Sequence, residues 1–416
     1  TLTFDSGQNI TDAASNALTV TTPTGTNNAT YDVVNSPTVT TGDNKGDNLT
    51  FSGYTADLAD GGGLSLAEAL HYASANQTVA FDLASGSTVD MNGGTLTVAS
   101  GVTFDTDSMS ALTISNGTLS LGGNVTFTNG TSDSLTVSSK LTGSGTLIKS
   151  GAGTLKLTST SNSDSTLATT VNAGTLEISA AANLGTGTLT MDTDGKLVVF
   201  GAVTLGNAVT LSNAGSGTGA NFFVRGGGST LTLDGVISGA GKLVKTSGGL
   251  LVLTKTNTYE GGTSISGNKG ISVTDSSNLG TGAITINKGQ SFGADGLIIT
   301  GSGVSITQDI VFAGGSISNA NTVTLAGSLS GSGMNKVGSG NLIIAGVEKT
   351  YTYTDGSVVD SDGNDITTSI MVSAGTLSGT TSSLTGNIVN NAAVEFSQST
   401  AGEYSKAISE IGRANV

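Results

Sequence analysis

Only a few residues of this chain have the types and spacing that could support catalysis. The 416-residue sequence has one histidine, His71, and no cysteine, so a Ser-His-Asp hydrolase would have to use that imidazole. Asp105 with Asp107, and Asp192 with Asp194, have the i,i+2 spacing that places two carboxylates on one face of a strand. Such pairs could cleave a glycosidic bond. Both pairs stand beside turn residues, where aspartate is common for conformational reasons, so we expect no enzyme activity.

An acidic segment near the end of the chain offers the oxygen ligands that hard cations prefer. It reads Asp360-Ser361-Asp362-Gly363-Asn364-Asp365. An EF-hand loop needs glycine at its sixth position and a bidentate glutamate at its twelfth, and neither occurs here. We therefore expect a polar loop in this segment, with no metal site and no cofactor.

The same segment contains the candidate binding element. Two tyrosines approach a turn at Asp355-Gly356 and two valines leave it, which predicts a hairpin that interrupts the surrounding pattern at about 347–370. Loops carried on a stiff scaffold commonly bind partners. The candidate binding residues are Tyr351, Tyr353, Asp355, Asp360, Asp362 and Asp365.

Charge narrows the choice of partners. The formal net charge is −15 and the isoelectric point is near 4.2, whereas nucleic-acid binding requires a basic stripe. Arg225 and Arg413 are the two arginines, so an anionic polysaccharide would find little complementary charge. We therefore expect no nucleic-acid partner. No apolar run approaches 18 residues, which predicts no membrane-spanning helix.

An internal repeat sets the elements that would have to position any site. The segment that begins at Leu141 reads LTGSGTLIKSGAGTLKL. A closely similar sequence begins at Ile237, and a shortened copy begins at Leu329. Two independent markers give offsets of 96 and 95 residues, so one unit of about that length was duplicated. The recurring markers are the lysines Lys149, Lys245 and Lys336, and the sequence NLGTG, which begins at Asn183 and again at Asn278.

Within each unit, apolar residues alternate with polar ones over short runs, as in Thr154-Leu155-Lys156-Leu157. This is the period of a strand with one buried face, and the runs recur about every ten residues, which predicts an all-β protein. No single unit has enough apolar residues for a sandwich core, so we predict a solenoid of about 20 stacked coils of roughly 20 residues each. Inward candidates in the first coils are Val79, Phe81, Leu96, Val98, Val102, Phe104, Leu112, Ile114, Leu119, Val125, Phe127, Leu135 and Val137.

One helix is expected, near the first regular coil. Ser65 and Glu68 have the spacing of a capping box, and Leu66, Leu70 and Ala73 fall on one helical face. The predicted organisation is irregular coils and loops over 1–63, a capping helix within 64–78, and a β-helix over 79–416. Because the last residues stop inside a repeat, we expect the chain to be a fragment of a longer protein.

The pattern Ile237-Ser-Gly-Ala-Gly-x-Leu-x-Lys245-x-x-x-Gly249-x-Leu-x-Leu253, followed by Asn257-Thr-Tyr-Glu-Gly-Gly-Thr263, resembles the passenger-associated β-strand repeats of bacterial autotransporters, of the AIDA and antigen 43 adhesin class. This resemblance implies a right-handed parallel β-helix outside a Gram-negative cell, associated with the outer membrane. It also implies export through a C-terminal membrane β-barrel in the parent protein. Protease members of the family carry Gly-Asp-Ser-Gly, and here Asp5-Ser6-Gly7 lacks the first glycine.

These observations predict a cell-surface adhesin or self-associating passenger domain that mediates bacterial aggregation, biofilm formation or host attachment. The expected partners are a second copy on a neighbouring cell, or a host surface protein or glycan. Two alternatives stay open: a passive stalk that displays another domain, and a β-helical enzyme that degrades polysaccharide.

Overall fold

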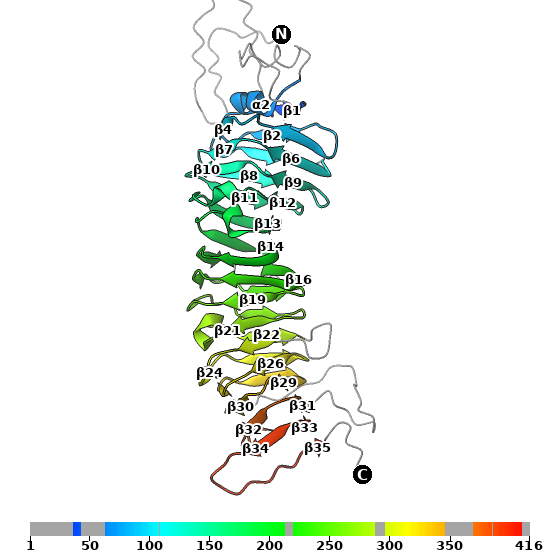
Figure 1. The fold of residues 1–416 in the computed structure, drawn as a ribbon, viewed down its shortest axis with the longest axis vertical. Helices are drawn as coiled ribbons and strands as arrows, with labels where there is room; N and C mark the ends of the chain where they lie inside the picture. Colours follow the sequence, from blue (N-terminus) through cyan, green and yellow to red (C-terminus); the bar gives the residue numbers. More distant parts are fainter. Residues whose placement is uncertain are drawn as a thin grey trace, which may run out of the picture.

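The computed structural model is a parallel β-solenoid of about 13 turns, and the residues that it describes include one α-helix. It describes residues 36–42, 63–107, 109–212, 219–287, 296–345, 369–384 and 386–409. The turns stack into an elongated rod, with the helix at the N-terminal end (Figure 1). Every pairing between named strands of the described residues is parallel, and the antiparallel contact is an isolated bridge between Asn287 and Gly314.

Each regular turn contributes one strand to each of three faces, which we call A, B and C in chain order. Face A begins with β1 (Thr38–Val39), β2 (Thr78–Phe81), β5 (Thr103–Asp105), β8 (Val125–Thr128), β11 (Thr146–Ser150), the start of β13 (Ala168–Ile178), the start of β14 (Leu189–Leu205), β15 (Val209–Leu211) and β17 (Ile237–Ser238). It ends with β24 (Val304–Ile306), β27 (Val323–Leu325), β30 (Asn341–Ile344), β32 (Thr376–Gly379) and β34 (Ala393–Phe396).

Faces B and C follow the same stacking. Face B contains β3 (Ser87–Asp90), β6 (Ala111–Ser115), β9 (Ser134–Val137), β12 (Thr154–Leu157), the end of β13, the middle of β14, the start of β16 (Ala220–Leu233), β18 (Leu243–Thr246), β20 (Thr263–Ile265), β22 (Ile284–Asn287), β25 (Ile310–Ala313) and β28 (Leu329–Ser332). Face C contains β4 (Thr95–Val98), β7 (Thr118–Leu121), β10 (Lys140–Gly143), the ends of β14 and β16, β19 (Leu250–Leu253), β21 (Ile271–Val273), β23 (Leu297–Ile299), β26 (Ser316–Asn319), β29 (Met334–Val337), β31 (Ser369–Val372), β33 (Asn387–Asn390) and β35 (Ile408–Ser409).

Short 3-10 helices replace strands in three places. They are η1 (Thr160–Asn162) and η2 (Ala181–Asn183) on face C, and η3 (Ser276–Leu279) on face A.

The predicted fold class is confirmed, but the predicted number of coils was too high. Val125 pairs with Leu147, and Ile284 pairs with Ile310, so a turn takes about 22 to 26 residues at these points. Because the connections between strands make each turn longer than 20 residues, fewer turns fit into the same length of chain. The structure therefore stacks about 13 turns, not about 20.

The interior is narrow and apolar, as the alternating pattern predicted. All the inward candidates are buried except Leu96, which is partly buried. Phe104 and Phe127 stack with their ring centroids 4.9 Å apart and nearly parallel planes. Such stacking is possible because parallel, in-register strands place equivalent side chains about 4.8 Å apart.

The predicted capping helix forms α2 (Leu66–Tyr72). The capping box is present, because the Ser65 backbone N–H donates to Glu68 Oε2 at 2.8 Å and the Glu68 N–H donates to Ser65 Oγ at 3.3 Å. Leu66 and Ala73 are buried and Leu70 is partly buried. The helix contacts β1 and β4 and covers the interior at this end of the described solenoid.

The duplicated unit turns about the long axis of the rod from copy to copy. Lys149 lies on face A, where it aligns with Phe127 and Val171. Lys245 lies on face B, beside Phe222 and Ile265. Following the ladders from β11 to β18 passes four complete turns and one further face. The third marker, on face C, follows the same step: Lys336 aligns with Ile317 and Val372. Equivalent residues of the three copies therefore point to three different sides of the rod.

Polar side chains inside the turns repeat with the unit. Asn162 accepts from the Leu141 N–H at 2.8 Å and donates to the Asn183 carbonyl at 2.8 Å. Asn257, 95 residues later, accepts from the Ile237 N–H at 2.7 Å and donates to the Asn278 carbonyl at 2.6 Å. These buried amides satisfy backbone groups that turns remove from the strand ladders.

Candidate functional site

The predicted binding residues lie outside the described part of the chain. Tyr351, Tyr353, Asp355, Asp360, Asp362 and Asp365, and the hairpin at about 347–370 that would carry them, fall within or beside the undescribed stretch 346–368. Their role stays a prediction. Ala345, the last described residue before this stretch, lines a groove in the side of the rod.

The residues first considered for catalysis lie on separate elements of the rod: His71 on α2, Asp105 on β5 and Asp192 on β14. His71 is exposed on α2, with its ring 5.0 Å from the Tyr72 ring in an edge-on contact. The Asp107 N–H donates to Asp105 Oδ1 at 3.0 Å, which is the local turn bond expected of aspartate. The register shifts between the pairs Val171–Met191 and Ala173–Asp194, so Asp192 falls within the irregularity and Asp194 follows it.

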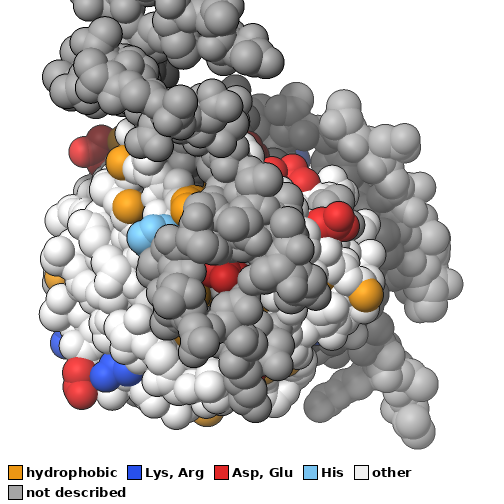
Figure 2. Space-filling model, turned by 90° about the horizontal axis from the view of Figure 1, so that it is seen from above, with side chains coloured by type: hydrophobic (Ala, Val, Ile, Leu, Met, Phe, Trp, Pro, Cys, Tyr) orange, Lys and Arg blue, Asp and Glu red, His pale blue; other side chains and the backbone are white. Residues whose placement is uncertain are grey.

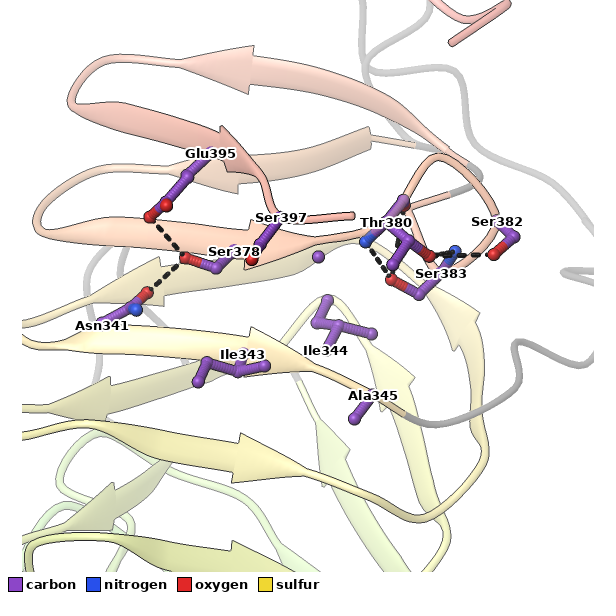
Figure 3. Close-up of a pocket in the computed structure, with 11 residues that line it drawn as sticks. Asn341, Ile343, Ile344, Ala345, Ser378, Thr380, Ser382, Ser383, Glu395 and Ser397 are labelled. Carbon is purple, nitrogen blue, oxygen red and sulfur yellow. Dashed lines mark hydrogen bonds between the residues drawn. The ribbon is translucent and has the colours of Figure 1, made fainter. Parts of the chain in front are cut away.

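The groove has a volume of about 530 Å³ and lies at the C-terminal end of face A (Figure 3). Three neighbouring strands, β30, β32 and β34, form one side, and the turn after β32 forms the other. Within the described residues, β28 is the last named strand of face B. No named strand of face B therefore lies next to β30, β32 and β34. The groove is lined by Asn341, Ile343, Ile344, Ala345, Ser378, Gly379, Thr380, Ser382, Ser383, Glu395 and Ser397.

A hydrogen-bonded row crosses the three strands. The Ser378 hydroxyl is 2.8 Å from Asn341 Oδ1 and 3.3 Å from Glu395 Oε2. One hydroxyl proton cannot serve both acceptors, so the Asn341 amide is better oriented with its NH₂ toward Ser378, which then donates to Glu395. Ser378 is 3% exposed, whereas Glu395 is exposed. This row fixes one carboxylate at the edge of the groove with acceptor capacity left over.

The turn on the other side presents hydroxyl groups. The Thr380 N–H donates to Ser383 Oγ at 2.8 Å, and the Thr380 and Ser382 hydroxyls are 2.8 Å apart. Figure 3 shows Thr380 and Ser383 on the turn across from Ser378 and Glu395, with Ser382 on the outer side of that turn and Ile343 and Ala345 on the strand below. The local hydrogen bonds hold the hydroxyls in place, which lowers the entropy that binding would have to remove.

The chemistry of the groove suits a neutral or weakly basic hydroxylated ligand. Its lining offers hydroxyl, amide and carboxylate groups beside aliphatic side chains, and it contains one ionisable side chain, Glu395. A small number of placed polar groups above an apolar base is typical of ligand sites. Within the described residues, no group of three or more His, Cys, Asp or Glu side chains could hold a metal ion.

Sequence reasoning missed this groove. Asn341, Ser378 and Glu395 are separated by 37 and 17 residues, and they meet because β32 pairs with both β30 and β34. The repeat pattern at 374–377 did indicate that a coil resumes there. It did not indicate which outward residues would align across the 346–368 stretch.

Sequence reasoning also gave no role to the recurring lysines, Lys149, Lys245 and Lys336, which we call the turn lysines. All three are fully buried. Lys149 Nζ donates to the carbonyls of Ser150, Gly151 and Ala173, and Lys336 Nζ donates to the equivalent carbonyls of Val337, Gly338 and Ala374. Lys245 Nζ donates to the carbonyl of Ser247 at 2.8 Å.

Burial lowers the pKa of each turn lysine to about 8. The alternation of the strand could have indicated their burial. Lys149 is two residues after the inward-facing Leu147, so both side chains lie on the same face of the strand. The turn lysines satisfy carbonyl groups inside the solenoid, which is a structural role.

Comparison with known proteins gives a limited match. The chain is similar to the Adhesin BmaC autotransporter of Brucella suis biovar 1 (strain 1330), with 30% identity over 193 residues. The match covers 44% of this chain and 5% of that protein, so the chain corresponds to a small part of the relative's length. No family model and no solved structure matches the chain.

Charge and hydropathy give little further guidance. Viewed along the long axis, the described part of the surface is mostly neutral polar side chains and backbone, with scattered charged and hydrophobic groups (Figure 2). No helix among the described residues has the length and apolar character needed to span a membrane.

Proposed function

We propose that this chain is part of the rod of a cell-surface adhesin, exposed outside the outer membrane of a Gram-negative bacterium. The observation that carries the proposal is the similarity to an autotransporter adhesin in a chain that folds as a parallel solenoid. A solenoid suits this role because each turn contacts only its neighbours, and the rod can extend from a surface while presenting ligands along its length.

The C-terminal groove is the proposed contact for a hydroxylated ligand, such as a neutral glycan on a host cell. Its hydroxyls and the Glu395 carboxylate would exchange hydrogen bonds with sugar hydroxyls, while Ile343 and Ala345 would contact the apolar face of a sugar ring. Attachment of bacteria to host cells, or to one another in aggregates and biofilms, would follow from many such contacts. Many weak contacts at one surface multiply affinity through their high effective concentration.

The test is to display the chain on bacteria that lack other adhesins and to measure attachment to host cells and self-aggregation. Glu395→Gln keeps the shape of the side chain and removes its charge, and Ser378→Val removes the hydroxyl that holds it. We expect each to reduce attachment about tenfold, because a hydrogen bond to a charged group contributes about 1.5–3 kcal/mol. Glu260→Gln, at an exposed residue far from the groove, is the matched control and should have no effect.

Deleting 350–365 tests the predicted hairpin separately. Attachment that falls only on this deletion would move the ligand contact from the groove to that segment. Attachment that survives all three changes would refute both sites.

A passive stalk is the second candidate. The matched region is 5% of the relative, so a rod of this size would be a minor part of such a protein and could serve to raise another domain from the surface. In that case none of the variants changes adhesion, and purified chain binds neither host cells nor itself at any concentration.

A further inference from the structure

The middle of face B carries two outward phenylalanines in an otherwise Thr- and Ser-rich surface. On β14, the outward residues are Lys196, Val198 and Phe200. On β16, the neighbouring strand, Phe223 aligns with Val198 and Arg225 aligns with Phe200. We call these five residues the aromatic platform. Val198 is 6% exposed although it faces outward, because the surrounding platform side chains cover it.

Both cations of the platform lie over aromatic rings. Lys196 Nζ is 5.2 Å from the Phe223 ring centroid, and Arg225 Cζ is 5.1 Å from the Phe200 ring centroid. These distances are within the range of cation–π attraction. Because Phe223 and Arg225 are two residues apart on one strand, the two positive charges are separated by roughly 7 Å along the strand direction.

Neither cation has a carboxylate partner among the described residues. The two ion pairs found there are Lys156 with Glu177 and Lys255 with Asp234. The first matters here, because Glu177 aligns with Val198 and would otherwise place a negative charge against the platform. Lys156 Nζ is 2.8 Å from that carboxylate and neutralises it. The platform therefore presents two cations that form no ion pair with a described carboxylate, while the exposed Asp194 lies two residues before Lys196 on β14.

A three-glycine arch adjoins Arg225. Between Phe200–Arg225 and Ala202–Thr230 the register shifts, and Gly226, Gly227 and Gly228 project from β16 as the extra residues. All three are exposed. The Ser229 hydroxyl closes the arch by donating to the Arg225 carbonyl at 2.6 Å while it accepts from the Gly201 N–H at 3.0 Å. A Cβ atom added at Gly227 or Gly228 would meet nothing within 4 Å, so there is open space at the arch that follows Arg225.

We propose that the aromatic platform binds an acidic glycan whose carboxylate or sulfate groups are sparsely spaced. The ligand must carry negative charge to pair with Lys196 and Arg225, and a flat apolar surface to lie against Val198 and the two rings. A sugar ring that bears an acidic group offers both, whereas an extended acidic peptide offers the charge without the flat ring. Dense polyanions are disfavoured, because the net charge of the whole chain repels them.

This site is independent of the C-terminal groove. The groove is lined by hydroxyls and one carboxylate and suits a neutral ligand, whereas the platform is cationic and lies several turns away (Figure 1). Failure at the platform would therefore leave the proposed adhesin function and its groove untouched.

The test uses the purified 416-residue chain and three probes of similar length: a hyaluronan oligosaccharide, neutral dextran and poly-glutamate. We expect hyaluronan to bind at low salt, to weaken as ionic strength rises because of screening, and to bind at least tenfold more tightly than the other two. Equal binding of dextran would overturn the role of charge. Equal binding of poly-glutamate would overturn the role of the sugar ring, and no hyaluronan binding would overturn the site.

Matched variants locate the site. Lys196→Gln combined with Arg225→Gln should reduce hyaluronan affinity at least tenfold, because charge-assisted hydrogen bonds are lost. The control, Lys255→Gln with Lys269→Gln, removes the same charge from two exposed positions elsewhere. If control and test variants lose affinity equally, general electrostatics explains the binding and the platform is refuted.

Gly227 provides a second comparison that does not disturb packing. Gly227→Glu adds a carboxylate beside Arg225, while Gly227→Gln adds the same bulk without charge. We expect the glutamate variant to lose hyaluronan binding several-fold and the glutamine variant to keep it. Equal affinities would place the ligand away from the arch and overturn the assignment, and identical circular dichroism spectra would show that both variants are folded.

Discussion

The buried asparagine that recurs as Asn162 and Asn257 leads to a specific prediction. Asn257 Oδ1 is the acceptor of the Ile237 N–H at 2.7 Å, and Asn257 Nδ2 donates to the Asn278 carbonyl at 2.6 Å. Asn257→Leu keeps nearly the same volume and removes both hydrogen bonds. Asn257 is 5% exposed, so water cannot readily replace the lost partners.

The expected cost follows from the two backbone groups left without partners. Each buried unsatisfied group costs about 1–3 kcal/mol, so the variant should lose about 2–6 kcal/mol of unfolding free energy. That is a large part of the total for a typical domain. Because turns of a solenoid can unfold locally, we also expect the Ile237 amide to exchange with deuterium much faster than in the wild type.

The repeat supplies an internal replicate and a control. Asn162→Leu removes the equivalent bonds to the Leu141 N–H and the Asn183 carbonyl and should cost about as much. Asn321→Leu removes an exposed bond to the Thr300 carbonyl and should cost less than about 0.5 kcal/mol. Urea unfolding and hydrogen exchange by mass spectrometry measure these effects. If Asn257→Leu unfolds within about 0.5 kcal/mol of the wild type, the explanation of the buried amides is wrong.

Further predictions concern the turns. The pKa of each turn lysine is about 8 in the folded chain, against 10.5 in an unfolded chain. Between pH 8 and 10.5, the unfolding free energy of the wild type should therefore rise relative to that of a variant with Met at all three positions. Urea titrations of both proteins should show this rise and should show none below pH 7. Ser247 has a φ of 74°, so Ser247→Gly should raise the unfolding free energy by about 0.5–1 kcal/mol, and a lower melting temperature would contradict this. A Cβ atom at Gly145 would lie 1.8 Å from the Gly123 carbonyl oxygen, so Gly145→Ala should cost about 1–3 kcal/mol, while Gly227→Ala should be neutral in the same thermal assay.

Much of the fold was predictable because it depends on short-range patterns. Strand period identified the inward residues of the first coils, and Ser65 with Glu68 identified the helix start, because both signals involve residues close in the sequence. The repeat also predicted stacking, since no unit could bury its apolar residues alone. The number of turns was not predictable, because it depends on connection lengths that the strand pattern does not fix.

The candidate sites depend on register between distant strands, and this limits what sequence can reveal. Ser378 meets Glu395 and Asn341 only because of the pairing after the 346–368 stretch. Likewise, the scarcity of arginine suggested little affinity for anionic sugars. The ladder nevertheless places Arg225 beside Phe200 and puts both Arg225 and Lys196 over aromatic rings of neighbouring strands. A composition total cannot show such local grouping.

The turning of the repeat from face to face also has a functional meaning. Because each copy is displaced by one face, the three copies cannot form one continuous binding surface along the rod.

The stacking of parallel turns in register is the claim on which these proposals depend, and the lack of cysteine makes it directly testable. Cysteines at Thr170 and Thr190, which are register partners on face A, should be joined by a short bifunctional thiol reagent that fluoresces only when both ends react. Cysteines at Thr170 and Val244, on different faces, should not. Strong fluorescence from the first pair alone is the predicted result, and fluorescence from both pairs or from neither would contradict the stacked, three-faced solenoid.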